Sequence, residues 1–366
     1  ETFRFVDLPV KPVPSLLRGF SAPVKVLYDF SDEDLRFLMA RDRDGFNRWE
    51  AAQALAQRVI LGLVEEPAAP VEPGFGAAFR EALLDEQSDP SLLAEVLTLP
   101  SESYLGDQME QVDVDGIHAA RERVMTGLAS ALREDLLEVY RRNRESGGYD
   151  LAPASIGRRR LRNTALSYLM QLDDAEVFDL CLGQFAAEHN MTDTMAALAL
   201  LAERAEARAE AALHRFYERW QRDPLVLDKW FAVQALAKRP DTLTRVEALL
   251  GHEAFSIRNP NKVRSLIGAF AAGNPVRFHE ASGRGYRFLA DRVLELDPLN
   301  PQVAARLLRT MSRWRRYAAP RRELMQEQLR RVLEQPDLSK DVYEVASRSL
   351  EPQPSSNGSD KHPCEA

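Results

Sequence analysis

The six histidines are the residues of this chain that could most readily hold a catalytic metal ion. The simplest hydrolytic zinc site places two histidines four residues apart on a helix, with a glutamate directly after the first. His252 and His279 each precede a glutamate, but the residues four positions on are serine and glycine. The sequence therefore predicts no metal ligand, and we expect both to be ordinary, partly exposed histidines.

Other kinds of catalytic residue are missing from the sequence as well. Cys181 lies in an apolar helical stripe with Phe178 and Phe185, which favours a core thiol over a nucleophile. No Gly-x-Ser-x-Gly motif occurs, and the pair Gly283 and Gly285 lacks the third glycine of a dinucleotide-binding loop. We therefore predict no catalytic residue in this chain.

Two arginine-rich stretches raise the question of nucleic-acid binding. One spans residues 158–162, and the other spans residues 313–322 around Trp314 and Tyr317. Basic side chains interleaved with aromatic ones are typical of single-strand binding. The formal net charge of −8 and the many nearby carboxylates favour solvated or salt-bridged helix faces instead. We expect no nucleic-acid partner.

Arg264 and Arg306 are the candidate binding residues. Each lies in the second turn of a predicted helix that begins with Asn-Pro, near the positive end of the helix dipole. If the two helices occupy equivalent places in successive pairs, the guanidinium groups converge into a site for a carboxylate. Asn261 would help to hold the first helix end. The alternative is that both arginines pair with internal carboxylates and brace neighbouring repeats.

The elements that would position these side chains fall into three segments. Residues 1–30 alternate apolar and polar side chains around Phe3 and Phe5 and again from Val24, a period of two that predicts strands. We interpret them as the terminal strands of a β domain with a linker, or as strands resting on a helical body. Residues 31–350 are predicted to be helical, and the polar, proline-rich residues 351–366 are predicted to be a disordered tail.

The helical segment reads as a long series of short helices rather than one bundle. Ser31 and Asp34 form a capping box, and the Asx-Pro starts at 223, 259 and 300 lie roughly forty residues apart, close to the period of helical repeats. The sequence predicts a mainly α fold, an α-α superhelix of HEAT- or armadillo-like pairs with a short N-terminal β segment. We expect one helix over 124–140, one over 260–272 and one over 301–314.

Several runs of residues then resemble one known family. The segments 14–25, 46–53, 228–231, 259–270 and 300–306 are similar to the C-terminal helical domain of bacterial aminopeptidase N, with the end of the preceding β-sandwich domain. The likeness covers nearly the whole chain up to about Leu350. In that family, a separate thermolysin-like domain carries the zinc ion and its His-Glu-x-x-His motif.

The resemblance implies a role without chemistry of its own. It implies a non-catalytic cap that covers the active site of a zinc-dependent aminopeptidase and limits access to peptides. The implied partners are the catalytic and β-sandwich domains of the same polypeptide and peptide substrates, and the zinc cofactor belongs to the catalytic domain. The arginines that match Arg264 and Arg306 face the enclosed cavity in the family, toward the C-terminal side of a bound peptide.

A second hypothesis is a free-standing helical-repeat scaffold that binds a protein or nucleic acid. Two isolated strands at the start of the chain argue against a self-sufficient scaffold. The chain has no apolar run of about 18 residues, so we expect no membrane span. The two cysteines form no disulfide framework, which together with the lack of a signal sequence predicts a cytoplasmic protein.

Overall fold

Helices begin where the sequence indicated capped starts. Ser31 Oγ accepts a hydrogen bond from the backbone N–H of Asp34, and the Asp34 carboxylate accepts one from the backbone N–H of Ser31. Asp223, Asn259 and Asn300 also cap their helices through the side-chain oxygen, each with proline as the next residue. These caps satisfy backbone donors that a helix leaves unpaired in its first turn.

The computed structural model describes residues 4–24, 26–145 and 147–352, and the chain divides into two compact units, up to Thr242 and from Leu243. The predicted mainly α, helical-repeat fold is confirmed. The first unit contains η1 (Arg18–Phe20), α1 (Asp32–Arg41), α2 (Gly45–Glu65), α3 (Pro73–Leu83), α4 (Pro90–Val96), α5 (Glu102–Gln108), α6 (Val114–Ala131), α7 (Arg133–Arg142), α8 (Pro153–Leu169), α9 (Ala175–Ala187), α10 (Met191–Ala202), α11 (Ala207–Trp220) and α12 (Pro224–Leu236).

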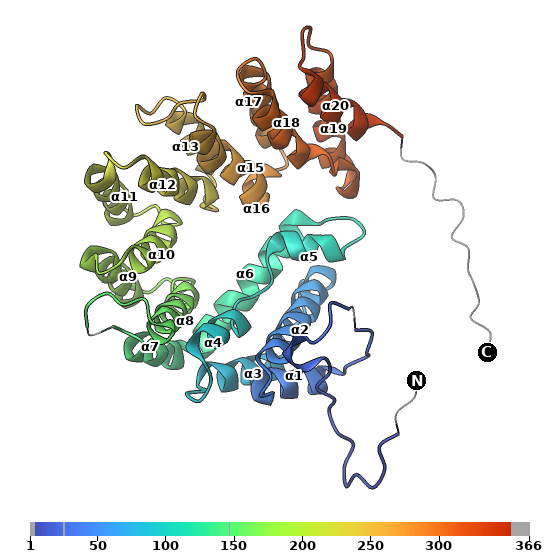
Figure 1. The fold of residues 1–366 in the computed structure, drawn as a ribbon, viewed down its shortest axis with the longest axis vertical. Coiled ribbons are helices and arrows are strands. Elements are labelled where there is room, and N and C mark those ends of the chain that lie inside the picture. The colour runs from blue at the N-terminus through green and yellow to red at the C-terminus, as the bar shows by residue number, and fades with distance from the viewer. Residues whose placement is uncertain (1–3, 25, 146, 353–366) are drawn as a thin grey trace, which may run out of the picture. The chain divides into compact units, whose positions relative to one another are not determined.

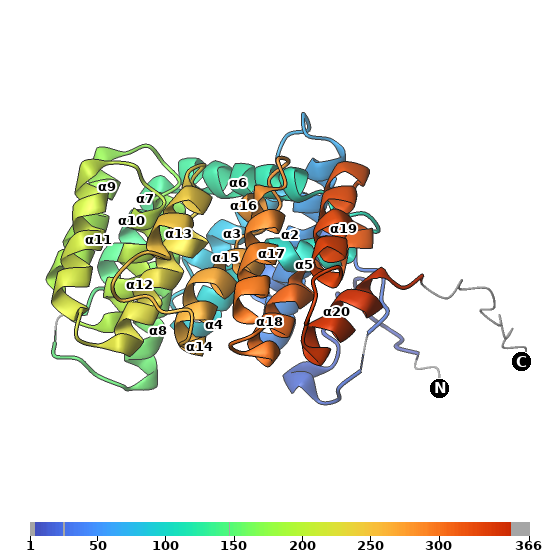
Figure 2. The ribbon, with the colours of Figure 1, turned by 90° about the horizontal axis from the view of Figure 1, so that it is seen from above.

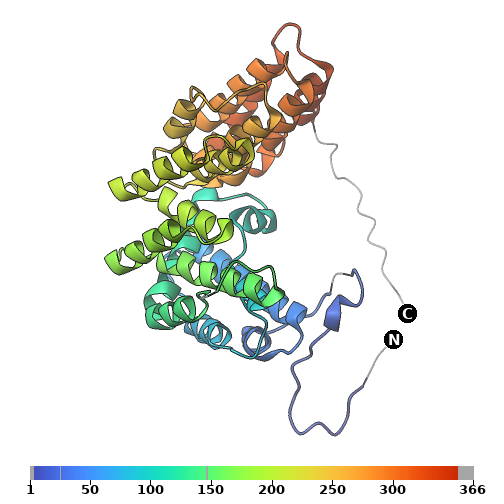
Figure 3. The same ribbon diagram turned by 60° about the vertical axis from the view of Figure 1, so that its left-hand side comes forward.

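From α7 to α12, helices of the first unit pack on their neighbours in the sequence, as in stacked helical hairpins. Figure 1 shows the succession from α7 to α12, and Figure 3 shows the same green and yellow helices from another side. Longer-range contacts join α4 to α8 and α2 to α6. Between these layers the ring of Phe79 lies edge-on to Tyr168 at 5.1 Å, and the buried Tyr168 hydroxyl donates to Leu97 O at 2.6 Å. The core therefore runs along the stack.

The second unit repeats this arrangement with shorter helices. Figure 2 shows α17 to α20 side by side, in agreement with their mutual contacts. Near the end, Trp314 Nε1 donates to Ser349 O at 2.9 Å, which fastens the last helix to the connection before α19. The unit contains α13 (Thr242–Leu249), α14 (Pro260–Val263), the π-helical turn η2 (Arg264–Gly268), α15 (Ala269–Gly273), α16 (Pro275–Phe278), α17 (Arg284–Leu296), α18 (Pro301–Leu308), the 3₁₀ turns η3 (Arg309–Met311) and η4 (Trp314–Arg316), α19 (Ala319–Leu333) and α20 (Lys340–Leu350).

The strands predicted in residues 1–30 do not form in the part of that segment that the structure describes. Residues 4–24 and 26–30 contain no strand, and Phe5, Val24 and Tyr28 are exposed. A period-two sequence becomes a strand only when a neighbouring strand pairs with it, and a pair of strands alone is marginal. Phe3 lies outside the described residues.

Part of this N-terminal segment rests on the helical body. Gly19 N–H donates to the carboxylate of Asp44 at 2.7 Å, and the ring of Phe20 lies 4.7 Å from that of Phe46. Arg18 also bonds the Asp42 carboxylate at 3.1 Å. The contacts hold residues 18–20 against the start of α2.

The helix predicted over 124–140 is broken in two at Leu132, which has φ −118° and ψ 22°. The apolar stripe predicted its buried face correctly, since Val124, Leu128 and Leu136 are all buried. The two halves pack on different partners, α6 on α2 and α5, and α7 on α8. Tertiary packing of this kind bends a helix that local propensity would leave continuous.

Two other predicted helices are also interrupted. The one over 260–272 contains the π-helical turn η2, and the one over 301–314 stops at Leu308 before a 3₁₀ turn. Within residues 4–24, 26–145 and 147–352, no helix is long and apolar enough to cross a membrane. The predicted disordered tail lies outside the described residues from 353 onward.

Candidate functional site

Arg264 lies at the start of the π-helical turn η2, one turn after the cap at Asn259. The Arg264 side chain is exposed, with Nε donating to Pro260 O at 3.1 Å and Nη2 donating to Asn261 Oδ1 at 3.0 Å. The guanidinium is thus folded back toward the helix N-terminus. Asn259, not Asn261, makes the cap, because its Oδ1 accepts from the Asn261 backbone at 2.9 Å. The Asn261 side chain orients Arg264 instead.

Arg306 extends from α18 between the buried residues Ala305 and Leu307. Its guanidinium is exposed. Within the described parts of the chain, no carboxylate lies in ion-pair distance of Arg306 or Arg264. The alternative interpretation, in which both arginines brace repeats by pairing with internal carboxylates, therefore has no such pair to support it here.

Arg264 and Arg306 belong to helical segments that touch. A methyl group built at Gly268 would lie 3.8 Å from Leu307 Cδ2 and 3.9 Å from Arg264 Cβ. Gly268 therefore marks a close approach of η2 to α18, with Arg264 one turn before the contact and Arg306 beside it. Whether the two guanidinium groups act together on one ligand stays a prediction.

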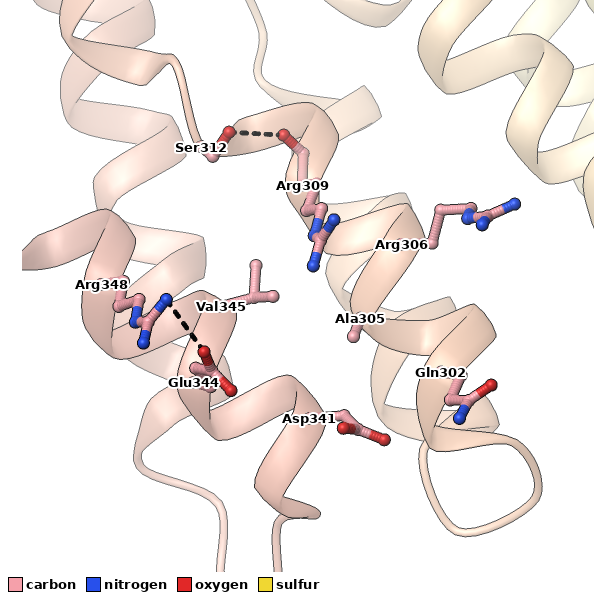
Figure 4. A pocket seen from close by; sticks show the side chains of 9 residues that line it. All are labelled: Gln302, Ala305, Arg306, Arg309, Ser312, Asp341, Glu344, Val345 and Arg348. Atoms are coloured by element: carbon pink, nitrogen blue, oxygen red, sulfur yellow. Dashed lines mark hydrogen bonds and ion pairs between the residues drawn. The ribbon is translucent and has the colours of Figure 1, made fainter.

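A groove of about 490 Å³ runs between α18 and α20 beside Arg306 (Figure 4). Arg309 points into it, whereas Arg306 extends to the side that faces away from α20. Arg348 is paired with Glu344 at 2.9 Å across one turn of α20. The groove is lined by Gln302, Ala305, Arg306, Arg309, Ser312, Asp341, Glu344, Val345 and Arg348.

Sequence reasoning missed Arg309 and Arg348 as neighbours of Arg306. Arg309 lies three residues on, so helical periodicity could have brought it into the set. Arg348 is on another helix, and only the packing of α20 on α18 places it at the same groove. Nothing in the local sequence around position 348 signals that contact.

His279 and Cys181 take structural positions. His279 is 5% exposed, which corrects the expectation of partial exposure, and its ring nitrogens lie 3.0 Å from Tyr286 Oη and 3.1 Å from Tyr317 Oη. Burial raises the pKa of the Cys181 thiol to about 12, as expected for a core residue. Among the described residues no group of three or more histidine, cysteine or acidic side chains could hold a metal ion.

The first arginine-rich stretch is built into the fold. Arg159 pairs with Glu145 at 2.7 Å, and Arg162 pairs with Asp193 at 3.0 Å while its guanidinium lies over the ring of Tyr140. Both arginines are almost fully buried. They are therefore bound inside the protein, in keeping with the predicted salt-bridged faces.

Helical pairs of this kind define a class, the armadillo-type repeat proteins. A family described as a domain of unknown function (DUF3458_C) with ARM repeats matches residues 32–351. The chain belongs to this family. Its residues are also similar to aminopeptidase N from Caulobacter vibrioides, with 42% identity over 352 residues, and from Escherichia coli, with 39% identity over 357 residues.

The similarity covers almost all of this chain and less than half of each relative. It spans 95% and 96% of the chain but 41% of each aminopeptidase N. The crystal structure of Legionella pneumophila aminopeptidase A in complex with aspartic acid is similar too, at 35% identity and a TM-score of 0.85, over 95% of this chain and 42% of that one. The resemblance to bacterial aminopeptidase N is thus confirmed, and this chain corresponds to the helical C-terminal region of such proteins.

Proposed function

We propose that this chain is the non-catalytic C-terminal region of a zinc-dependent aminopeptidase, an enzyme that removes N-terminal residues from peptides. The observation that carries the proposal is similarity over nearly the whole chain to only 41% of each aminopeptidase N. The zinc ion and the reacting groups would belong to the rest of that polypeptide. This region would cover the active site and restrict entry to peptides, in the cytoplasm and without a nucleic-acid or membrane partner.

The proposed contribution to substrate binding is a pair of arginines for the peptide C-terminus. Arg264 and Arg306 are exposed, lie on touching helical segments and have no carboxylate partner among the described residues. An arginine guanidinium binds a carboxylate through charge-assisted, often bidentate hydrogen bonds. Asn261 holds the Arg264 guanidinium in place at 3.0 Å, which reduces the ordering cost when a ligand binds.

The N-terminal segment supports the proposed partner, the β-sandwich domain of the same polypeptide. Phe5, Val6, Val10 and Leu27 are 66–86% exposed, an unusual density of large apolar side chains for a solvated segment. Residues with a period of two that lack a paired strand in the described part of this chain fit the edge of a sheet supplied by other residues of the polypeptide.

The test measures Michaelis constants in the aminopeptidase polypeptide proposed to contain this chain. Arg306→Ala should raise KM about tenfold for short peptides with a free C-terminus, because a charge-assisted contact to the carboxylate is lost. The KM for the same peptides with a C-terminal amide should change much less.

Arg287→Ala provides a matched control, since Arg287 is an exposed arginine of α17 with no ion pair among the described residues. This variant should leave both substrate types unaffected. An equal effect of Arg306→Ala on free and amidated peptides would reject the carboxylate-binding role.

A further inference from the structure

A second cavity, of about 790 Å³, lies within the first unit and is lined by none of the arginines discussed above. Its volume falls in the range of about 300–1,000 Å³ that is usual for small-molecule sites. Residues from α6, the ends of α8 and α10, and the segment after α12 surround it. The lining residues are His118, Arg121, Glu122, Met125, Ser167, Met170, Gln171, Leu200, Glu203, Arg204, Ala205, Lys238, Arg239, Pro240 and Asp241.

Carboxylates gather around Lys238, a residue that lines this cavity. The Lys238 ammonium lies 3.2 Å from Glu122 Oε1 and 3.3 Å from Glu102 Oε1, and the Lys238 backbone N–H donates to Glu203 at 2.6 Å. Glu102 also lies 2.9 Å from His118 Nδ1, and its other oxygen is buried with no hydrogen-bond partner. Glu122 and Glu102 thus contact the Lys238 ammonium, and Glu203 contacts the backbone of the same residue.

The Glu203 side chain is exposed to solvent, although it lines a concave part of the surface and protein atoms surround it there. Desolvation by those surroundings raises the pKa of its carboxyl, and the charge of Glu122 acts in the same direction. Glu122 and Glu203 both line the cavity and both contact Lys238, Glu122 at the ammonium and Glu203 at the backbone N–H.

The lining also carries two guanidinium groups with neutral partners. Arg121 donates from Nε to Pro100 O at 3.0 Å and from Nη1 to Met125 Sδ at 3.3 Å. Arg204 donates from Nη2 to two carbonyls at the end of α8, Met170 O and Leu172 O, both at 2.9 Å. Within the described ranges neither arginine pairs with a carboxylate, and the Nε and Nη1 protons of Arg204 have no protein acceptor.

We propose that this cavity binds a small dipolar molecule, an amino acid or short peptide with both termini free. The ammonium group would lie between Glu122 and Glu203, and the carboxylate would bond to Arg121 and Arg204. The thioether groups of Met125 and Met170, which also line the cavity, would contact the apolar part of the ligand. The carboxylates would repel a simple anion, and the guanidinium groups would repel a simple cation. A ligand that carries both charges therefore fits best.

This proposal does not depend on the aminopeptidase role. The chain would be labelled with ¹³C at the methionine methyl groups and titrated with trialanine. The Met125 and Met170 methyl signals should shift saturably, whereas Met191, which lines a separate hollow, should not respond. N-acetylated trialanine and trialanine amide should each bind at least about tenfold more weakly, since each loses one charge-assisted contact.

Substitutions test the contributions of the carboxylates and of the guanidinium groups separately. Glu203→Gln should weaken binding of trialanine about tenfold but leave binding of the N-acetylated peptide unchanged. Arg204→Lys should weaken binding of trialanine, which has a free carboxylate, but leave binding of trialanine amide unchanged. Glu218→Gln, on the exposed face of α11, is the matched control and should have no effect. The remaining methionine signals report whether each variant is folded. Equal affinity for free and blocked peptides, or no shift at about 10 mM peptide, would overturn the proposal.

Discussion

Arg48 is a charged residue at the centre of the first unit, with only 2% of its surface exposed. Its guanidinium donates to Met39 O at 2.8 Å, to the Asp85 carboxylate at 2.7 Å and to Ser88 Oγ at 2.9 Å. Desolvation acts to raise the pKa of Asp85, but the hydrogen bonds from Arg48 and Ser88 outweigh it and hold this pKa at about 2. The residue therefore joins the end of α1 to the connection after α3.

Arg48→Met should lower the free energy of unfolding by about 3 kcal/mol at neutral pH, because it leaves Asp85 and the backbone carbonyls of Met39 and Ala40 without their partner. The folded-state pKa of Asp85 is below the ordinary value of 3.8. The contribution of the ionised Asp85 to the free energy of unfolding is therefore fully present above pH 3.8. That contribution is lost as the pH falls toward 2, and the difference between wild type and variant should narrow there.

Urea denaturation at several pH values measures this effect. Arg58→Met is the matched control, since the Arg58–Asp32 pair is about half exposed and should contribute at most about 1 kcal/mol. A destabilisation by Arg48→Met that is no larger than that of Arg58→Met would contradict the account of Asp85.

At the scale of elements, Gly285 in α17 shows how closely two segments approach. A Cβ atom built at this position would lie 2.2 Å from the carbonyl oxygen of Phe278, at the end of α16. This is backbone, which cannot rotate away. The φ angle of Gly285 is not in the left-handed region. Glycine is therefore required here for space, and not for its backbone conformation.

Gly285→Ala should therefore lower the thermal unfolding midpoint of the chain by several degrees, through a steric cost of about 1–3 kcal/mol. Gly127→Ala in α6 is the matched control, since nothing lies within 4 Å of a Cβ at that position. In a helix interior this control should stabilise the protein by about 0.5–1 kcal/mol. Scanning calorimetry measures both, and equal midpoints for the two variants would reject the steric argument.

The sequence was sufficient to predict where helices begin, but it was not sufficient to predict where they are interrupted. Side-chain caps at Ser31, Asp223, Asn259 and Asn300 depend on neighbouring residues alone, so local reasoning finds them. The break at Leu132 depends on which helices α6 and α7 meet, and that information is not local. The strands predicted in residues 1–30 do not form in the described part of that segment, for the related reason that a strand needs a partner.

At the scale of the whole molecule, the binding residues could be predicted only in part. Arg264 and Arg306 follow from two Asn-Pro starts, a signal in the sequence, and the contact at Gly268 brings their helical segments together. Arg309 lies three residues after Arg306 and was within reach of helical periodicity, whereas Arg348 joins the groove only through the packing of α20 on α18. The cavity around Lys238 collects residues more than 100 positions apart, as its contact with Glu122 illustrates. Contacts between residues so far apart in the sequence can be predicted only once the fold is known.

The central proposal is that this chain belongs to an aminopeptidase without carrying its chemistry. The most direct test incubates the purified chain with zinc and an alanyl or leucyl chromogenic amide, followed by repeated chromatography to remove contaminating peptidases. The account predicts no turnover by the chain alone, since its described residues contain no group of metal-ligating side chains. Zinc-dependent turnover that co-elutes with the chain through every column would contradict it.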